Sequence, residues 1–137
     1  MRPTRFQDFA LDLAKNSPDC GQARTLADTG VTKYPYGLSA TASGREIQWQ
    51  FIAQSRDGDK FTEPETITKA EQPISLEAVP DGGLPEERWF AELLARSGSE
   101  EITAFELWSP RPNNRKGHDG VTVFFADSAR IYARVID

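Results

Sequence analysis

The alternation of apolar and polar residues in "REIQWQFIAQ", residues 45–54, restricts the fold more than any other stretch of the chain. In an extended strand, successive side chains point to opposite faces. One face of this strand then carries Ile47, Trp49, Phe51 and Ala53, and the other carries Gln48, Gln50, Ile52 and Gln54. Antiparallel sheets commonly pack one face on a core and leave the other in water. The pattern therefore predicts a sheet with an apolar core face and an amide-rich open face.

Further segments have the composition of strands in the same sheet. A Ser-Gly turn follows "LSATA" and predicts a hairpin with the alternating strand. Period-two alternation also recurs near the end of the chain, where "ADSAR" makes a tight connection between the last two strands. The strands expected from these patterns are residues 38–42, 45–54, 101–108, 120–126 and 131–136.

Two weaker strand candidates lie between the hairpin and the later strands. One begins near Lys60, where Pro64 makes it short or restricts it to a sheet edge. The other is "ISLEAV", residues 74–79. Residues 22–37 are interpreted as a loop, and the sequence does not reveal the isomer of the Tyr34–Pro35 bond.

Two segments have the periodicity of amphipathic helices. Residues 4–16 carry an apolar stripe, and Thr4 with Gln7 has the spacing of a capping box. Residues 85–97 begin with Pro85, which suits the first helical position. Both helices have one apolar side with which to pack on a sheet.

The order of these elements, a helix and strands followed by a helix and strands, predicts an α+β fold. We expect a single domain over residues 1–137, which is an ordinary length for one domain. Its core is a mainly antiparallel sheet of about five to seven strands, with the two helices packed on one face.

Charge is distributed unevenly along the chain. The net charge is -5, yet residues 61–106 hold eleven acidic and three basic side chains. General affinity for nucleic acid requires several phosphates to be neutralised at once, so non-specific binding is not expected. An acidic surface can instead attract a basic protein partner. The first functional hypothesis is therefore a non-enzymatic binding protein, such as an adaptor, inhibitor or immunity-type protein, acting through Glu63, Glu65 and Glu71.

The stretch "SPRPNNRKGHDG", residues 109–120, collects cations between two predicted strands. Its prolines, asparagines and glycines favour turns, but a hairpin needs fewer residues and no positive charge. A charged tip can simply keep the hairpin soluble. The alternative hypothesis is a nucleic-acid or other anion site, because arginine suits phosphate and asparagine can bond to bases. Its candidate residues are Arg111, Asn113, Asn114, Arg115, Lys116 and His118.

Catalytic and metal signatures are weak. His118 and Asp119 are adjacent, but such pairs act through space and no activated nucleophile accompanies them. A single histidine and the lone Cys20 cannot build a structural zinc site. No metal or cofactor is therefore expected, and an enzyme with a site assembled from distant residues is the second alternative.

Two further features bear on location and partners. Trp108 alternates with Glu106, so it falls either in the core or on the open face, where an exposed tryptophan would suit an interface. The chain has no apolar run of membrane-spanning length, and acidic residues interrupt the first segment. We expect a cytoplasmic protein without membrane contact.

Overall fold

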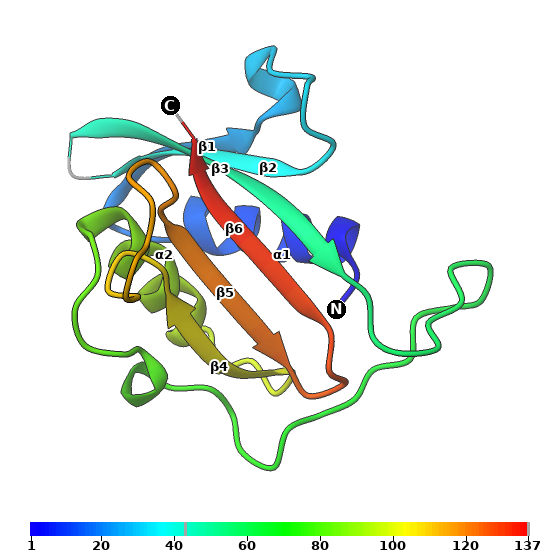
Figure 1. Ribbon diagram of the computed structural model, residues 1–137. Coiled ribbons are helices and arrows are strands. Elements are labelled where there is room, and N and C mark those ends of the chain that lie inside the picture. Colours follow the sequence, from blue (N-terminus) through cyan, green and yellow to red (C-terminus); the bar gives the residue numbers. More distant parts are fainter. Residues whose placement is uncertain (43, 137) are drawn as a thin grey trace.

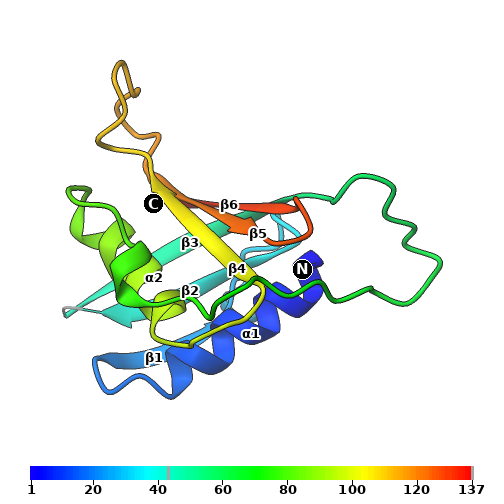
Figure 2. The same cartoon turned by 90° about the horizontal axis from the view of Figure 1, so that it is seen from below.

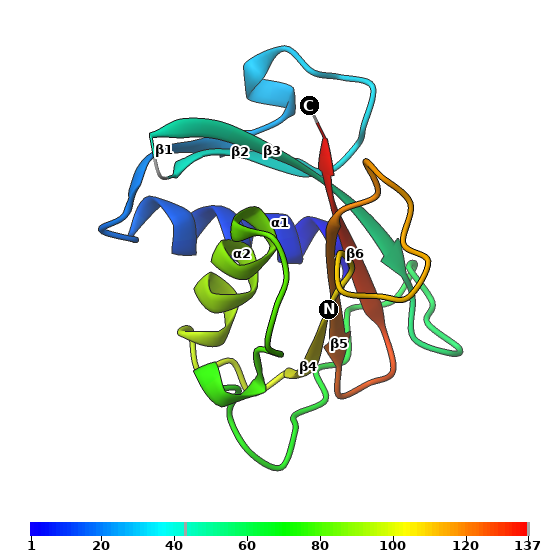
Figure 3. The same cartoon turned by 60° about the vertical axis from the view of Figure 1, so that its left-hand side comes forward.

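The computed structural model describes residues 1–42 and 44–136, which form a six-stranded antiparallel sheet with two α-helices on one face (Figure 1). The helices are α1 (Pro3–Lys15) and α2 (Pro85–Ala95), and the strands are β1 (Cys20–Thr25), β2 (Gly37–Ala42), β3 (Arg45–Gln54), β4 (Ile102–Leu107), β5 (Gly120–Phe125) and β6 (Arg130–Ile136). Their order across the sheet is β1-β2-β3-β6-β5-β4. The predicted α+β class and the antiparallel sheet are confirmed, as is the packing of both helices on one face (Figure 3).

The same order of elements occurs twice along the chain. Each half contributes one α-helix followed by three strands, and the last strands of the two halves, β3 and β6, pair at the centre of the sheet. No repeat is evident in the sequence itself. Similar backbone plans in the two halves therefore arise from different side chains.

Aromatic rings join the helices to the core face of the sheet. Phe6 of α1 meets Phe51 of β3 edge to face, with ring centroids 5.0 Å apart. Phe90 of α2 stacks on Trp49 at 5.4 Å, and both side chains are fully buried. Such pairs add to the free energy gained from burial alone. The predicted core face of β3 is thus confirmed, although Ala53 near its end is exposed.

Strand β1 overlaps the start of the loop predicted at residues 22–37, so that prediction is wrong for residues 22–25. "CGQART" has no apolar alternation, and its strand conformation comes from main-chain pairing with β2, in which Ala23 lies opposite Ala40. Cys20 therefore lies in a strand rather than a loop, and burial raises the pKa of its thiol. The Tyr34–Pro35 bond that follows is trans.

The segment 55–84, called the strap below, contains neither of the two weaker predicted strands (Figure 2). Its regular structure is a single 3-10 turn at Leu76–Ala78. Isolated main-chain bonds hold the strap instead, including Ile74 N–H to the Ser99 carbonyl at 2.9 Å. Proline residues, which cannot donate to a strand ladder, interrupt the segment and favour isolated bonds over a continuous strand.

The capping box predicted at the start of α1 does not form. Arg2 is the N-cap and Pro3 is the first helical residue. Proline suits this position because it has no N–H that would need a partner. The side chain of Gln7 instead accepts a hydrogen bond from Gly37 N–H at 2.9 Å. Thr4 donates to the Tyr36 hydroxyl at 3.2 Å. Both side chains therefore join α1 to the start of β2.

Ion pairs fasten the strap to the first turn of α1. Arg2 Nη2 lies 3.0 Å from Asp59 Oδ1, and the hydrogen bond and charge of Arg2 lower the Asp59 pKa. Arg5 donates to Glu65 and to Glu101, each at 2.9 Å. Burial by itself would raise the Glu65 pKa, but hydrogen bonds from Arg5 and Arg2 N–H bring it below its ordinary value. In their charged form, Asp59 and Glu65 thus hold the strap against the start of α1.

Acid is expected to release the strap before the core unfolds. Because the folded-state pKa values of Asp59 and Glu65 are lowered, their stabilisation is complete above the ordinary values and is lost as pH falls below about 4. Hydrogen exchange read by mass spectrometry, corrected for intrinsic rates, should show faster exchange in the strap at low pH. Glu65→Gln should produce the same change near neutral pH. Equal protection of the strap at both pH values would contradict this expectation.

Candidate functional site

The sheet face opposite the helices, called the open face, is the main uncovered surface (Figure 3). In its central rows, Gln50 lies beside Arg134 and Ile52 lies beside Tyr132. Ile52 is 45% exposed, and Tyr132 and Arg134 are half-buried. Phe124 of β5 lies on the same face, and its ring centroid is 4.8 Å from the Arg130 guanidinium. Aromatic rings, arginines and amides therefore share one surface of paired strands.

Trp108 lies on the open face but is largely covered. Its indole N–H donates to Thr122 Oγ1 at 2.8 Å, and the Arg111 guanidinium lies 5.2 Å from the ring centroid. The ring also lies against Gly120, where an added Cβ would be 2.9 Å from two ring atoms. Only 9% of Trp108 is exposed, so its ring packs beneath the residues that follow it and offers little surface to a partner.

The hairpin loop, residues 108–119, projects from the open face on the side away from the helices (Figure 2). Glu87 of α2 fixes its two ends. This fully buried carboxylate accepts hydrogen bonds from Ser109 N–H at 3.0 Å and Gly120 N–H at 2.8 Å. It also accepts from the Ser109 hydroxyl and from Leu84 N–H, the latter at 2.9 Å. The loop is thus attached to the core through a single side chain from the first turn of α2.

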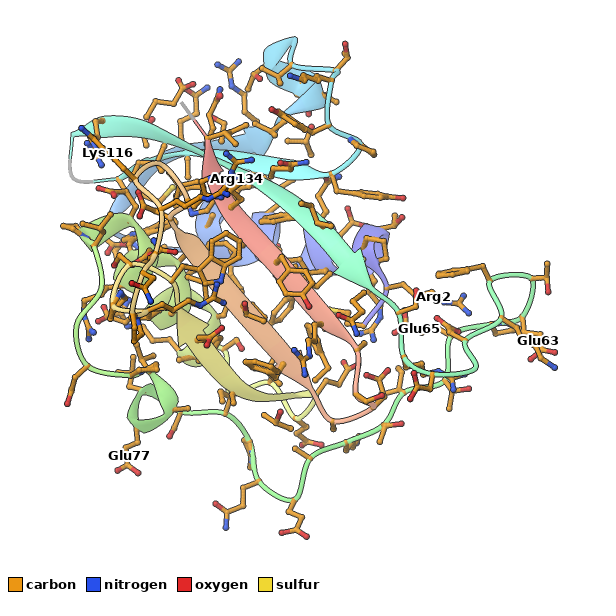
Figure 4. The ribbon with its side chains drawn as sticks, in the orientation of Figure 1. Arg2, Glu63, Glu65, Glu77, Lys116 and Arg134 are labelled. Carbon is orange, nitrogen blue, oxygen red and sulfur yellow. The ribbon has the colours of Figure 1, made fainter. Side chains whose placement is uncertain are left out.

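The predicted loop residues divide into two groups. Arg111 pairs with Glu106 and covers Trp108, while Asn114 donates to the His118 carbonyl at 3.0 Å. Asn113 has a left-handed backbone with φ 62°. These residues shape the loop, whereas exposed Arg115, Lys116 and His118 present their side chains to solvent, with Lys116 near the outer end of the loop (Figure 4).

Two hollows lie on the open face beside the hairpin loop. One has a volume of about 470 Å³ and lies between the loop residues and Tyr132. The other, of about 320 Å³, lies where the segment 26–36 approaches the hairpin loop, and Arg134 lines it. Both are open to solvent, so they suit contact with a surface or an extended chain more than enclosure of a small substrate.

The carboxylates of the acidic stretch are largely used within the fold. Those in ion pairs are Glu65 and Glu101 with Arg5, Glu86 with Arg45, Glu92 with Arg88, Glu100 with Lys69, and Glu106 with Arg111. Of the three predicted surface residues, Glu63 and Glu71 are exposed on the strap. Glu65 instead lies beside Arg2, while Glu63 points away from the body of the protein (Figure 4). The structure therefore does not gather the three into one patch.

His118 and Asp119, adjacent in sequence, do not form a hydrogen-bonded pair in the described part of the chain. His118 is exposed. Residues 1–42 and 44–136 contain no cluster of three or more potential metal ligands. Within the same part of the chain, neither α-helix is long and apolar enough to cross a bilayer.

Comparisons with protein-family models, curated proteins and solved structures found no match to this chain. Function is therefore inferred from the open face itself, on which the sequence analysis missed Arg130, Tyr132 and Arg134. A signal for these residues was present. They alternate with apolar residues in "RIYARVI", as the glutamines do in residues 45–54.

Proposed function

We propose that this chain is a non-enzymatic protein-binding module that contacts its partner with the open face and the adjoining hairpin loop. The observation that carries the proposal is the gathering of Tyr132, Arg130, Arg134 and Ile52 on a sheet face that no helix covers. Paired strands hold these side chains in fixed rows, so little backbone ordering is needed on binding.

The composition of the open face supports a protein partner. Protein interfaces are enriched in tyrosine, tryptophan and arginine and depleted in lysine and glutamate. On this side, the paired central strands β3 and β6 present amides, arginines, an exposed isoleucine and a tyrosine. Glu106, the carboxylate on the outer strand, is paired with Arg111.

Two other partner surfaces stay as alternatives. Exposed Glu63 and Glu71 support a basic partner met on the strap. Exposed Arg115 and Lys116 support nucleic acid on the hairpin loop. Each alternative rests on two charges in a connecting segment. The open face instead combines paired strands with the residue composition of an interface.

Affinity capture with matched double variants distinguishes these surfaces. We expect Gln50→Ala with Tyr132→Ala to reduce recovery of a stoichiometric protein partner from host lysate by at least about tenfold, as loss of interface anchors does. Glu63→Gln with Glu71→Gln should leave recovery unchanged, and nuclease treatment should have no effect. All variants should keep the parental melting temperature to within a few degrees, about the shift caused by 1 kcal/mol or less.

The opposite pattern would reject the open face. Undiminished capture by the Gln50 and Tyr132 variant, with loss in the Glu63 and Glu71 variant, would move the interface to the strap. Capture that disappears with nuclease and with Arg115→Ala and Lys116→Ala would assign the protein to nucleic acid through the hairpin loop.

A further inference from the structure

Arg134 lies on the open face near the C-terminal end of β6, where that strand pairs with both β3 and β5. In the register of the sheet it lies opposite Gln50 of β3 on one side and Gly120 of β5 on the other. Its side chain is half-buried and lines the smaller hollow (Figure 4). The other residues around this hollow are Val31, Tyr34, Gln48, Gly117, Asp119, Val135 and Ile136.

The guanidinium of Arg134 lacks partners within the described residues. It forms no ion pair there, and its Nε is buried without a hydrogen-bond partner. By contrast, Arg2, Arg5 and Arg111 each pair with a carboxylate. A buried donor left without an acceptor carries an energetic penalty, and penalties are larger for charged groups. An anion that reached this guanidinium would therefore gain from a group that the fold has left uncompensated.

The surroundings of the hollow favour a negative ligand. Arg115, Lys116 and Arg130 are exposed on the same side of the molecule. Two carboxylates lie near: Asp119 lines the hollow, and exposed Glu46 accepts a hydrogen bond from the Gln48 amide at 3.2 Å. Neither of them pairs with Arg134 among the described residues. The outer nitrogens of an arginine form a planar fork that matches a carboxylate. The amide of Gln50 can add a hydrogen bond beside it.

We infer, building on the proposed function, that the partner presents an acidic peptide segment and that one of its carboxylates binds Arg134 between the segment 26–36 and the hairpin loop. A polyphosphate backbone fits less well. It requires several cations at closely spaced phosphates, and a chain of net charge -5 repels a polyanion. A peptide with separated carboxylates can place one charge on Arg134 with less repulsion, because its charges are fewer and farther apart.

The probe is a short acetylated peptide of alternating glutamate and glycine, with a glutamine version as its matched control. Binding to isotope-labelled protein is followed by NMR on the Arg134 Nε–H, the Trp108 indole N–H and the Gly120 amide. We expect a saturable shift at all three groups with the glutamate peptide and none with the glutamine peptide. Arg134→Gln should weaken the glutamate peptide by about tenfold or more, the effect of one charge-assisted hydrogen bond.

Lys15→Gln is the matched control. Lys15 is exposed in the last turn of α1, on the helical side of the sheet. The substitution removes an equal charge away from the open face, so it should change affinity by less than about threefold, as expected for an exposed charge. Arg134→Lys should recover only part of the affinity because lysine keeps the charge but loses the fork. Thermal melts of each variant identify any loss of folding.

Several results would overturn the inference. They are the absence of a saturable shift with the glutamate peptide, equal binding of the glutamine peptide, and equal affinity of the Arg134→Gln variant. Binding of an oligothymidylate in place of the peptide would also do so, and would favour nucleic acid. Failure here is distinct from failure of the proposed function. If Arg134→Gln captures partner normally while Gln50→Ala with Tyr132→Ala does not, the open face stays the interface and only the anchor is wrong.

Discussion

Replacing Glu87 by alanine is expected to lower the free energy of unfolding by about 4 kcal/mol, because several buried donors then lose their acceptor. The two carboxylate oxygens of Glu87 accept from Leu84 N–H, Ser109 N–H, the Ser109 hydroxyl and Gly120 N–H. Urea denaturation of the purified variant measures the loss.

The same substitution should also free the hairpin loop. Glu87 joins the start of α2 to both ends of that loop, so amide exchange at Ser109 and Gly120 should accelerate more than exchange in α1. Glu87→Gln should be nearly as damaging, since an amide turns an NH₂ group toward donors that face a carboxylate oxygen.

Glu86 provides the matched control for Glu87. It is the preceding residue in the same helical turn and pairs with exposed Arg45, so Glu86→Ala should cost less than about 1 kcal/mol. Similar losses in the Glu86 and Glu87 variants would show that the effect belongs to the helix terminus and not to the buried hydrogen bonds.

Gly120→Ala is expected to destabilise the fold by about 3 kcal/mol through steric overlap. The new Cβ would lie 2.3 Å from the Ala133 carbonyl oxygen and 2.9 Å from the Trp108 ring. The carbonyl belongs to the central strand β6 and cannot move alone, so the ring of Trp108 or the strand pairing must shift. Denaturation measures the cost, and quenching of tryptophan fluorescence should report greater access to Trp108.

Gly21→Ala controls for the general effect of adding a methyl group to a strand glycine. Gly21 lies in edge strand β1, where the nearest atoms to a new Cβ are 3.7 Å away. This substitution should be neutral or slightly stabilising, because alanine restricts the unfolded chain more than glycine does. Equal stability of the Gly120 and Gly21 variants would disprove the close approach of Trp108 to β5.

Much of the fold was predictable because the relevant signals are local. The alternation around Trp49 and the apolar stripes of residues 4–16 and 85–97 assign secondary structure from neighbouring residues. The observed α2, Pro85–Ala95, begins at the predicted residue. The two weaker strand predictions in the strap were wrong because the strand propensity of a short run is easily overridden by its tertiary context.

The candidate site was predictable in part. The loop at residues 109–120 and the open glutamine face were both singled out from the sequence, but as separate surfaces. The structure brings them together because β6 pairs with β3 on one side and with β5 on the other. Arg134 thereby lies between the glutamine row and the hairpin loop. The alternation within its strand indicates a polar face, but only the pairing of β6 with β3 and β5 sets its position on that face.

The sequence by itself determined the periodic elements and the division of the sheet into an apolar face and a polar face, since these depend on spacing within each segment. Tertiary structure alone decided the burial of Glu87, which accepts hydrogen bonds from residues 22 and 33 positions away. It also decided that Glu65 serves as an anchor for the strap and that Arg134 stays without a partner among the described residues. A charge in sequence has no fixed role, because its energy depends on which donors, acceptors and solvent the folded chain places around it.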